Sequence, residues 1–239
     1  MRKIFLYELK RLLWNKFFLG LVLVLLFYGW QVLGSVTILG VSHTAPFSPW
    51  SFGDYLSRML PLLWIGALFF LSYFTSREER RRAVLTGATP ARPAVYALVR
   101  CGAALVGTAL LCLAVALLAR AFYGRMFHWY GWGTLLFPAL ITLVPPLVFA
   151  LGSGWVLGRL RPWLVFAWML LPFLLMALPL PEWFGLWNGS IFTDRPLSLG
   201  TLDPAFSLPA GTAAVQCAVL LAGGALFAVQ PGKPAARKG

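Results

Sequence analysis

Residues 75–93 read TSREERRRAVLTGATPARP and form the longest polar run in a chain that is 60% hydrophobic. The run holds five arginines together with the adjacent Glu78 and Glu79. Apolar segments long enough to cross a bilayer flank it on both sides. Basic loops between membrane spans face the cytoplasm. The sequence therefore predicts a cytoplasmic loop, which acts either as a topology signal alone or as the contact point for a cytoplasmic partner.

Length and composition place the chain among integral membrane proteins. It has 239 residues, of which only 11% are charged, whereas soluble proteins carry about 25%. The net charge of +13 comes from basic residues in short loops between apolar segments. That pattern indicates positive-inside topology, and no nucleic-acid partner is expected. Cys101, Cys112 and Cys217 lie within apolar segments, so we expect packing residues and not a disulfide framework.

Six apolar segments are long enough to cross the hydrocarbon core, which takes about 20 helical residues. We therefore predict an all-α integral membrane protein that forms one transmembrane domain. The expected spans are residues 17–40, 55–74, 94–118, 134–158, 163–180 and 211–229. Of the 20 lysines and arginines, all but Arg58, Arg120, Arg125 and Arg195 fall on the side of the 75–93 loop. This asymmetry predicts a multi-pass plasma-membrane protein with both termini in the cytoplasm.

Residues 2–15, RKIFLYELKRLLWN, have the periodicity of an amphipathic helix. One face carries Phe5, Leu6, Leu9, Leu12 and Leu13, and the charged residues, including Lys10 and Arg11, fall elsewhere. A helix of this kind lies in the membrane surface with its basic side chains at anionic lipid headgroups. A cytoplasmic extension of the first span is the alternative.

Two features of the later spans carry specific predictions. Pro145 and Pro146 lie in mid-span and are expected to kink or break the fourth helix. Gly154 and Gly158 have the spacing that allows two membrane helices to approach closely. Residues 181–210 are too apolar for a solvated loop, so we expect a re-entrant or interfacial segment on the outer side.

The sequence lacks the residues of a catalytic or energy-coupling site. It contains no G-x-x-x-x-G-K-[ST] phosphate-binding run. His43 and His128 fall in different loops and do not suffice for a metal site. No carboxylate lies inside a predicted span, which argues against a proton- or cation-coupled carrier. Asp54 is expected at the outer end of span two, where it can pair with Arg58 at i, i+4, although Arg58 can equally extend to the lipid headgroups. We expect no catalytic residue and no metal on this chain.

The order of these features resembles the permease subunits of type-2 ATP-binding-cassette (ABC) exporters. The resemblance rests on the basic elbow MRKIFLYELKRLLWNKFF, the loop REERRRAVLTGATPARPAVYALVR and the long apolar segment before the last span. In the family, this loop carries a Glu, then a Gly, then a Pro near an Arg-rich start of span three. Glu78 or Glu79, Gly87, Pro90 and Arg100 match that order here.

The resemblance implies a cytoplasmic coupling helix at residues 77–88 that docks on a separate ATPase subunit. Its contact residues would be Glu78, Glu79, Arg80, Arg81, Ala83, Val84, Leu85 and Gly87. The elbow helix would touch the same ATPase through Phe5, Leu9, Lys10, Arg11 and Leu12. This chain would hold no cofactor, because ATP and Mg²⁺ belong to the ATPase. A second permease subunit and membrane lipids complete the implied partners.

The resemblance also implies a cargo path lined by spans two and five, with Pro61 and Pro172 setting their bends. The segment after span five would form gating helices that contain Trp183, Phe184, Trp187 and Phe192. An aromatic interior without carboxylates favours a hydrophobic or amphipathic cargo, such as a peptide, a drug or a lipid-like molecule. The alternatives are a non-transporting anchor, immunity or sensor subunit, and a self-sufficient carrier or intramembrane enzyme.

Overall fold

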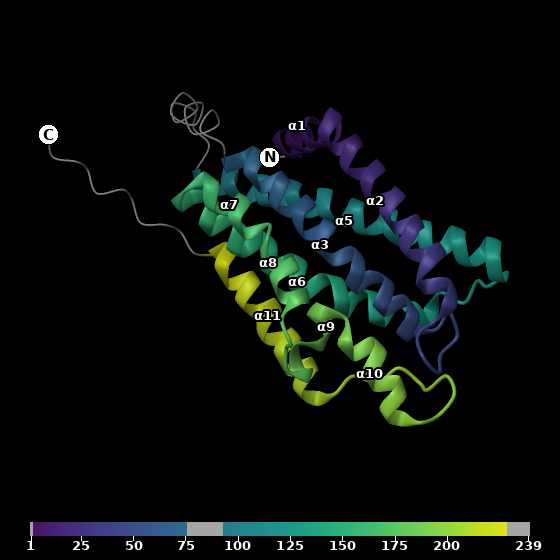
Figure 1. The fold of residues 1–239 in the computed structure, drawn as a ribbon. Coiled ribbons are helices and arrows are strands. Elements are labelled where there is room, and N and C mark those ends of the chain that lie inside the picture. The colour runs from purple at the N-terminus through teal and green to yellow at the C-terminus, as the bar shows by residue number, and fades with distance from the viewer. Residues whose placement is uncertain (1, 76–92, 229–239) are drawn as a thin grey trace, which may run out of the picture.

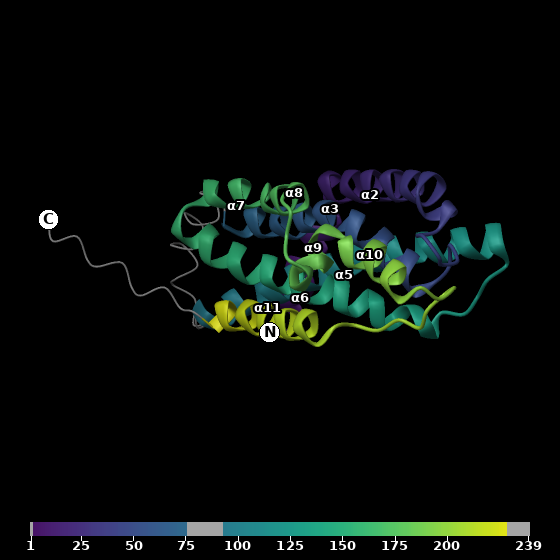
Figure 2. The same ribbon diagram turned by 60° about the horizontal axis from the view of Figure 1, so that its bottom comes forward.

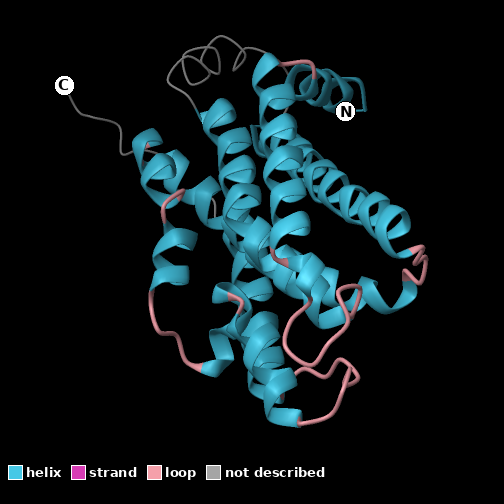
Figure 3. Ribbon diagram, turned by 45° about the vertical axis from the view of Figure 1, so that its right-hand side comes forward, coloured by secondary structure: helices cyan, strands magenta, loops and turns pink. Residues whose placement is uncertain are grey.

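The computed structural model describes residues 2–75 and 93–228, and this part of the chain is helical without strands (Figure 3). Five of its helical segments are long and apolar enough to cross a membrane. They are α2 (Lys16–Ser35, extended by a 3-10 turn at Thr37–Leu39), α3 (Pro49–Thr75), α5 (Pro93–Phe127), α6 (Gly133–Leu160) and α11 (Ala210–Ala228). The chain is therefore an all-α, multi-pass membrane protein.

The predicted fifth span is divided into two short helices, α7 (Pro162–Trp168) and α8 (Leu171–Ala177). Proline has no backbone N–H, so Pro172 leaves the carbonyl of Trp168, four residues earlier, without a helical donor. The indole N–H of Trp64 on α3 donates to that carbonyl at 3.1 Å. The break is thus held by a neighbouring helix.

Two helices extend beyond their predicted spans. α3 begins at Pro49, where the side-chain oxygen of Ser48 accepts the backbone N–H of Ser51 at 3.2 Å. This is an N-cap followed by proline at the first helical position, a combination that starts helices well. The residues just before the predicted start of span two, including Asp54, are therefore helical. α5 likewise continues to Phe127, nine residues beyond the predicted end of span three at residue 118.

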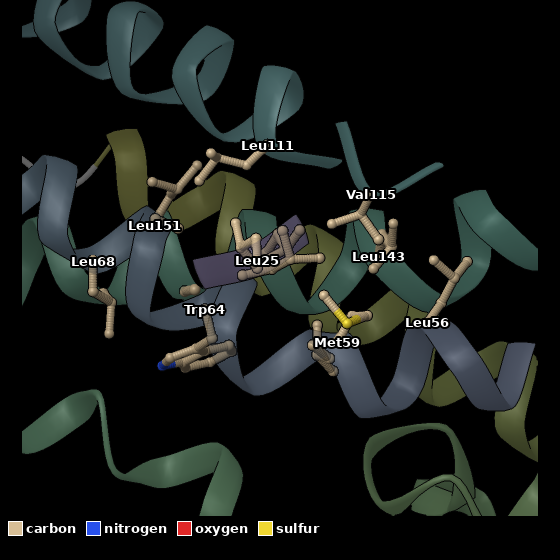
Figure 4. Close-up of a cluster of buried hydrophobic side chains, with 14 of the residues drawn as sticks. Leu25, Leu56, Met59, Trp64, Leu68, Leu111, Val115, Leu143 and Leu151 are labelled. Carbon is tan, nitrogen blue, oxygen red and sulfur yellow. The ribbon is translucent and has the colours of Figure 1, made fainter. Parts of the chain in front are cut away.

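α3 is the central helix of the bundle, and α2 and α11 lie on opposite sides of it (Figures 1 and 2). In its most apolar stretch, 72% of the residues of α3 are buried, against 22% for α2 and 17% for α11. Figure 4 shows the core around α3. Its members include Met59, Trp64 and Leu68 of α3, Leu25 of α2, Leu111 and Val115 of α5, and Leu143 and Leu151 of α6.

α6 runs without a break through Pro145 and Pro146, so these prolines do not interrupt the helix. Gly154 and Gly158 face α3. A Cβ atom on Gly158 would lie 2.9 Å from the side chain of Thr75, and one on Gly154 would collide with a leucine side chain of α3. The close helix contact expected from their spacing is therefore present.

α11 packs on another face of α6 and runs parallel to it (Figure 2). The two backbones meet at Gly152 and Gly223, where a Cβ on Gly152 would collide with the carbonyl of Gly223. A Cβ on Gly223 would lie 2.7 Å from the backbone of Phe149. Backbone contacts of this kind need glycine on both helices.

α1 (Arg2–Leu13) lies at the end of the bundle where α3 ends and α5 begins (Figure 1). At the opposite end, the segment after α8 folds into a 3-10 turn (Glu182–Phe184), α9 (Gly185–Asn188) and α10 (Ser190–Leu199). α9 and α10 pack against α3, and the 3-10 turn packs against α11.

Candidate functional site

Polar side chains gather where α1 crosses the end of α3 and the start of α5. They are Glu8 and Arg11 of α1, Tyr73 of α3, and Tyr96 and Arg100 of α5, and are called here the loop-end cluster. α3 and α5 are the two helices that border residues 76–92. The loop-end cluster therefore lies at the end of α3 and the start of α5, the last and first described helices on either side of that segment.

Glu8 is the centre of the loop-end cluster and is only 1% exposed. The hydroxyl of Tyr96 donates to its Oε1 at 2.6 Å. The guanidinium groups of Arg100 and Arg11 each approach the Glu8 carboxylate to 3.6 Å, one at each oxygen. A carboxylate out of water is tolerated only where opposite charges and hydrogen bonds surround it. The three partners of Glu8 thus make its burial possible.

The two arginines extend the loop-end cluster to α3. Arg11 donates through Nε to the hydroxyl of Tyr73 at 2.7 Å, and its guanidinium lies 4.7 Å from the centre of that ring. Arg100 donates to the hydroxyl of Tyr96 at 3.1 Å, and its Nη1 lies 3.5 Å from the carbonyl of Phe74. Arg100 also stacks over the Tyr96 ring at 4.4 Å. One polar network therefore joins α1, α3 and α5.

The predicted apolar face of α1 is only partly the packed face. Leu12 is buried and Phe5 and Leu9 are half-buried, whereas Leu6 is exposed. Lys10 is exposed, as its place outside the apolar face predicts. Glu8 and Arg11, however, turn towards α5 and α3. The helical periodicity of α1 does not predict this packing of Glu8 and Arg11, because their polar partners lie on α5 and α3.

The predicted coupling residues Glu78, Glu79, Arg80, Arg81, Ala83, Val84, Leu85 and Gly87 lie outside the described residues. Sequence reasoning missed Tyr73 and Tyr96 of the loop-end cluster. A signal for one of them was present, since Tyr96 stands at i, i+4 to Arg100 on one face of a helix.

Two of the four predicted gate residues pack against α3. Trp187 is buried, with its ring 5.8 Å from that of Trp64 in an edge-to-face arrangement. Phe192 is fully buried against Gly53, where any Cβ atom would collide with the phenyl ring. Phe184 is half-buried, and Trp183 is exposed. The segment therefore docks on α3 through α9 and the start of α10.

A groove of about 710 Å³ runs between α2, α3 and α8. Its lining residues are Leu23, Val24, Phe27 and Tyr28 of α2, Arg58, Pro61 and Leu62 of α3, and Phe173 and Met176 of α8. Arg58 donates through Nε to the buried Asp54 carboxylate at 2.8 Å, so the predicted i, i+4 pair is confirmed. The groove is otherwise aliphatic and aromatic.

In residues 2–75 and 93–228, no group of three or more His, Cys, Asp or Glu side chains is arranged to hold a metal ion. No family model, curated protein or solved structure matches the chain. The resemblance to ABC permeases thus rests on the order of sequence features, and the function is proposed from this chain's own residues.

Proposed function

We propose that this chain is the membrane-spanning permease subunit of an ABC exporter. It moves a hydrophobic or amphipathic molecule across the plasma membrane, and a separate ATPase chain binds Mg²⁺ and hydrolyses ATP. The chain crosses the membrane six times, with α7 and α8 together as the fifth crossing. Both termini and residues 76–92 face the cytoplasm. The observation that carries the proposal is the loop-end cluster.

The loop-end cluster lies where movement of a docked ATPase would be passed to the membrane helices. A partner docked on residues 76–92 pushes on the end of α3 and the start of α5. Because Arg11 contacts Tyr73 and Glu8 contacts Tyr96, α1 is attached to both helices by charged contacts. A buried charged network resists separation, since each group that leaves it exposes an unpaired partner. The three helices would therefore move together.

α3 also reaches the parts of the chain that face the cargo. Its Trp64 contacts the carbonyl of Trp168 at the α7–α8 break and the ring of Trp187 on α9. Its Arg58, Pro61 and Leu62 line the groove beside α2 and α8. A displacement of α3 would thus alter the groove and the proposed gate in one step. This supports a path along spans two and five.

The test is purification of the chain from its native membranes with its partners intact. We expect a chain with a Walker A sequence to co-purify. Reversing both Glu78 and Glu79 to arginine is expected to release that chain. The control is Arg125→Glu, a charge reversal on an exposed residue at the opposite end of α5. Absence of any nucleotide-binding partner, or transport by the single chain without ATP, would overturn the proposal.

A second measurement separates transport from anchoring. The purified complex is placed in liposomes with a labelled amphipathic cargo. ATP-dependent movement of that cargo supports a permease. An ATPase partner that hydrolyses ATP without any cargo movement, whatever amphipathic or hydrophobic molecule is offered, would indicate an anchor or sensor subunit.

A further inference from the structure

The groove between α2, α3 and α8 has the size and lining of a site for an amphiphile. Its volume of about 710 Å³ falls within the range of about 300–1,000 Å³ typical of small-molecule sites. Leu23 and Phe27 of α2 and Phe173 of α8 are all exposed in it. These side chains offer an apolar surface that a hydrocarbon tail can cover.

One charged group interrupts this apolar lining. Arg58 is the only charged residue among those that line the groove, and 38% of its side chain is exposed. Asp54 occupies its Nε, and within the described part of the chain no acceptor is placed at Nη1 or Nη2. These two nitrogens form the fork that binds carboxylates and phosphates in bidentate fashion.

The position of Arg58 along α3 decides whether a carboxylate or phosphate from the membrane can reach it. Arg58 lies about 14 Å along the helix axis from Pro49. α3 has 27 residues and is therefore about 40 Å long, whereas the hydrocarbon core is about 30 Å thick. Arg58 is thus about a third of the way along α3 from Pro49, where an anionic group carried on a membrane-embedded tail can reach its guanidinium. Such a group would satisfy Nη1 and Nη2.

A second copy of the chain fits the groove less well. Neither α2 nor α8 contains an aspartate or glutamate that would meet Arg58. In a two-fold contact through this face, each copy would also bring its own Arg58 towards the other. Charge complementarity therefore favours an occupant that carries an acid of its own.

We propose that the groove binds an anionic amphiphile drawn from the bilayer. Its carboxylate or phosphate is held by Nη1 and Nη2 of Arg58, and its tail lies against Phe27, Leu62 and Met176. The inference rests on the proposed function in taking this groove as part of the cargo path, but binding itself requires neither an ATPase nor ATP.

The experiment uses the full chain in nanodiscs of neutral phosphatidylcholine and two photoreactive probes with the same tail. One probe is a fatty acid with a diazirine in its tail, and the other is the corresponding fatty alcohol. After irradiation, mass spectrometry locates the adducts. We expect the acid to label peptides of α2 and α8 about tenfold more than the alcohol, the change that one charge-assisted contact contributes.

Variants of the ion pair test the role of Arg58. Arg58→Gln is expected to lower labelling by the acid to the level of the alcohol, without changing labelling by the alcohol. Because Arg58→Gln leaves the buried Asp54 without its cation, Asp54→Asn combined with Arg58→Gln provides a neutral pair of similar shape. The double variant is expected to lose the same preference. Arg58→Lys keeps the positive charge but lacks the two forked guanidinium nitrogens. This variant is expected to retain part of the preference for the acid over the alcohol.

Two results would overturn the inference. One is equal labelling of the groove by acid and alcohol, or a preference that survives in the neutral double variant. The other is efficient disulfide formation between two copies of a Leu23→Cys variant in the bilayer, since a second copy would then cover the groove. Either result leaves the proposed permease role standing. Conversely, a missing ATPase partner with intact acid labelling removes that role and leaves the binding site.

Discussion

The indole N–H of Trp64 donates to the backbone carbonyl of Trp168 at 3.1 Å, and this contact spans 104 positions of the chain. The carbonyl is available because Pro172 has no N–H to offer it. Trp168 is further fixed from the other side, since its own indole donates to the hydroxyl of Ser153 on α6 at 2.8 Å. The break in the fifth apolar segment is therefore pinned between α3 and α6.

The first prediction concerns the donor of this contact. Trp64→Phe keeps an aromatic ring in the core but leaves the Trp168 carbonyl without a partner. An unsatisfied buried polar group costs about 1–3 kcal/mol, and loss of ring volume adds to it. Thermal unfolding of the purified chain in detergent measures the change. Trp183→Phe, at an exposed position, is the matched control and is expected to change stability by less than about 0.5 kcal/mol. Equal melting temperatures of the two variants would contradict the role of Trp64.

The second prediction concerns the proline. In Pro172→Ala, the new backbone N–H can bond to the Trp168 carbonyl, so the indole is no longer needed as a donor. Trp64→Phe is therefore expected to be less damaging in the Pro172→Ala background, with a coupling of about 1 kcal/mol in a double-mutant cycle. Strict additivity of the two substitutions would show that the proline and the indole act independently.

The third prediction concerns the loop-end cluster. Glu8→Gln removes the carboxylate that lies 3.6 Å from both Arg11 and Arg100. Removing one partner of a buried ion pair costs about 3–5 kcal/mol of folding stability. Because the Arg11 side chain is 23% exposed and water can solvate its charge, we expect a loss near the lower end of this range. Lys10→Gln, a charge removal on the exposed side of the same helix, is the control and should be nearly neutral.

Helix separation gives a second measurement for the same pair of variants. In Glu8→Gln, α1 is expected to become accessible to protease at lower temperature than the rest of the chain, because its charged contacts with α3 and α5 are lost. Unchanged protection of α1 relative to Lys10→Gln would show that apolar contacts alone hold this helix.

The fourth prediction uses two adjacent glycines of α11. A Cβ on Gly223 would lie 2.7 Å from the backbone of Phe149, which cannot move aside as a side chain can. Gly223→Ala is therefore expected to separate α11 from α6 and to cost about 1–3 kcal/mol. Gly224 has open space around its Cβ position, so Gly224→Ala should be neutral or stabilising by up to about 1 kcal/mol. Similar losses in both variants would contradict the helix contact.

Apolar length predicted the five long helices well, because a segment of about 20 apolar residues satisfies its backbone internally and needs no partner to define it. Their ends were less predictable. The N-cap Ser48 and Pro49 extend α3 beyond its apolar part, and a search for apolar segments does not detect a cap.

The break between α7 and α8 was beyond local reasoning for a different reason. Pro61 and Pro145 stand inside continuous helices, whereas Pro172 stands beside a break. Residue type is the same in all three cases. At Pro172, the carbonyl that the proline frees is satisfied by Trp64, which lies far away in the sequence.

In the candidate site, too, local features were predictable from the sequence and contacts between distant residues were not. A basic amphipathic helix was evident at residues 2–15, but its packed face depends on a bond between Glu8 and Tyr96, which lie 88 positions apart. Likewise, the pairing of Asp54 with Arg58 was predictable because it is local, whereas the groove that Arg58 faces requires α2 and α8 to come together.

In the proposed permease, energy enters through residues 76–92 from a separate ATPase. Site-specific photo-cross-linking from Val84 in native membranes tests it most directly, with a probe at Trp183 as the control at the other end of the bundle. We expect a cross-linked product from Val84 that contains a chain with a Walker A sequence, and no such product from Trp183. Absence of a nucleotide-binding chain from the Val84 product, or its capture from Trp183 instead, would show that residues 76–92 do not receive energy from an ATPase.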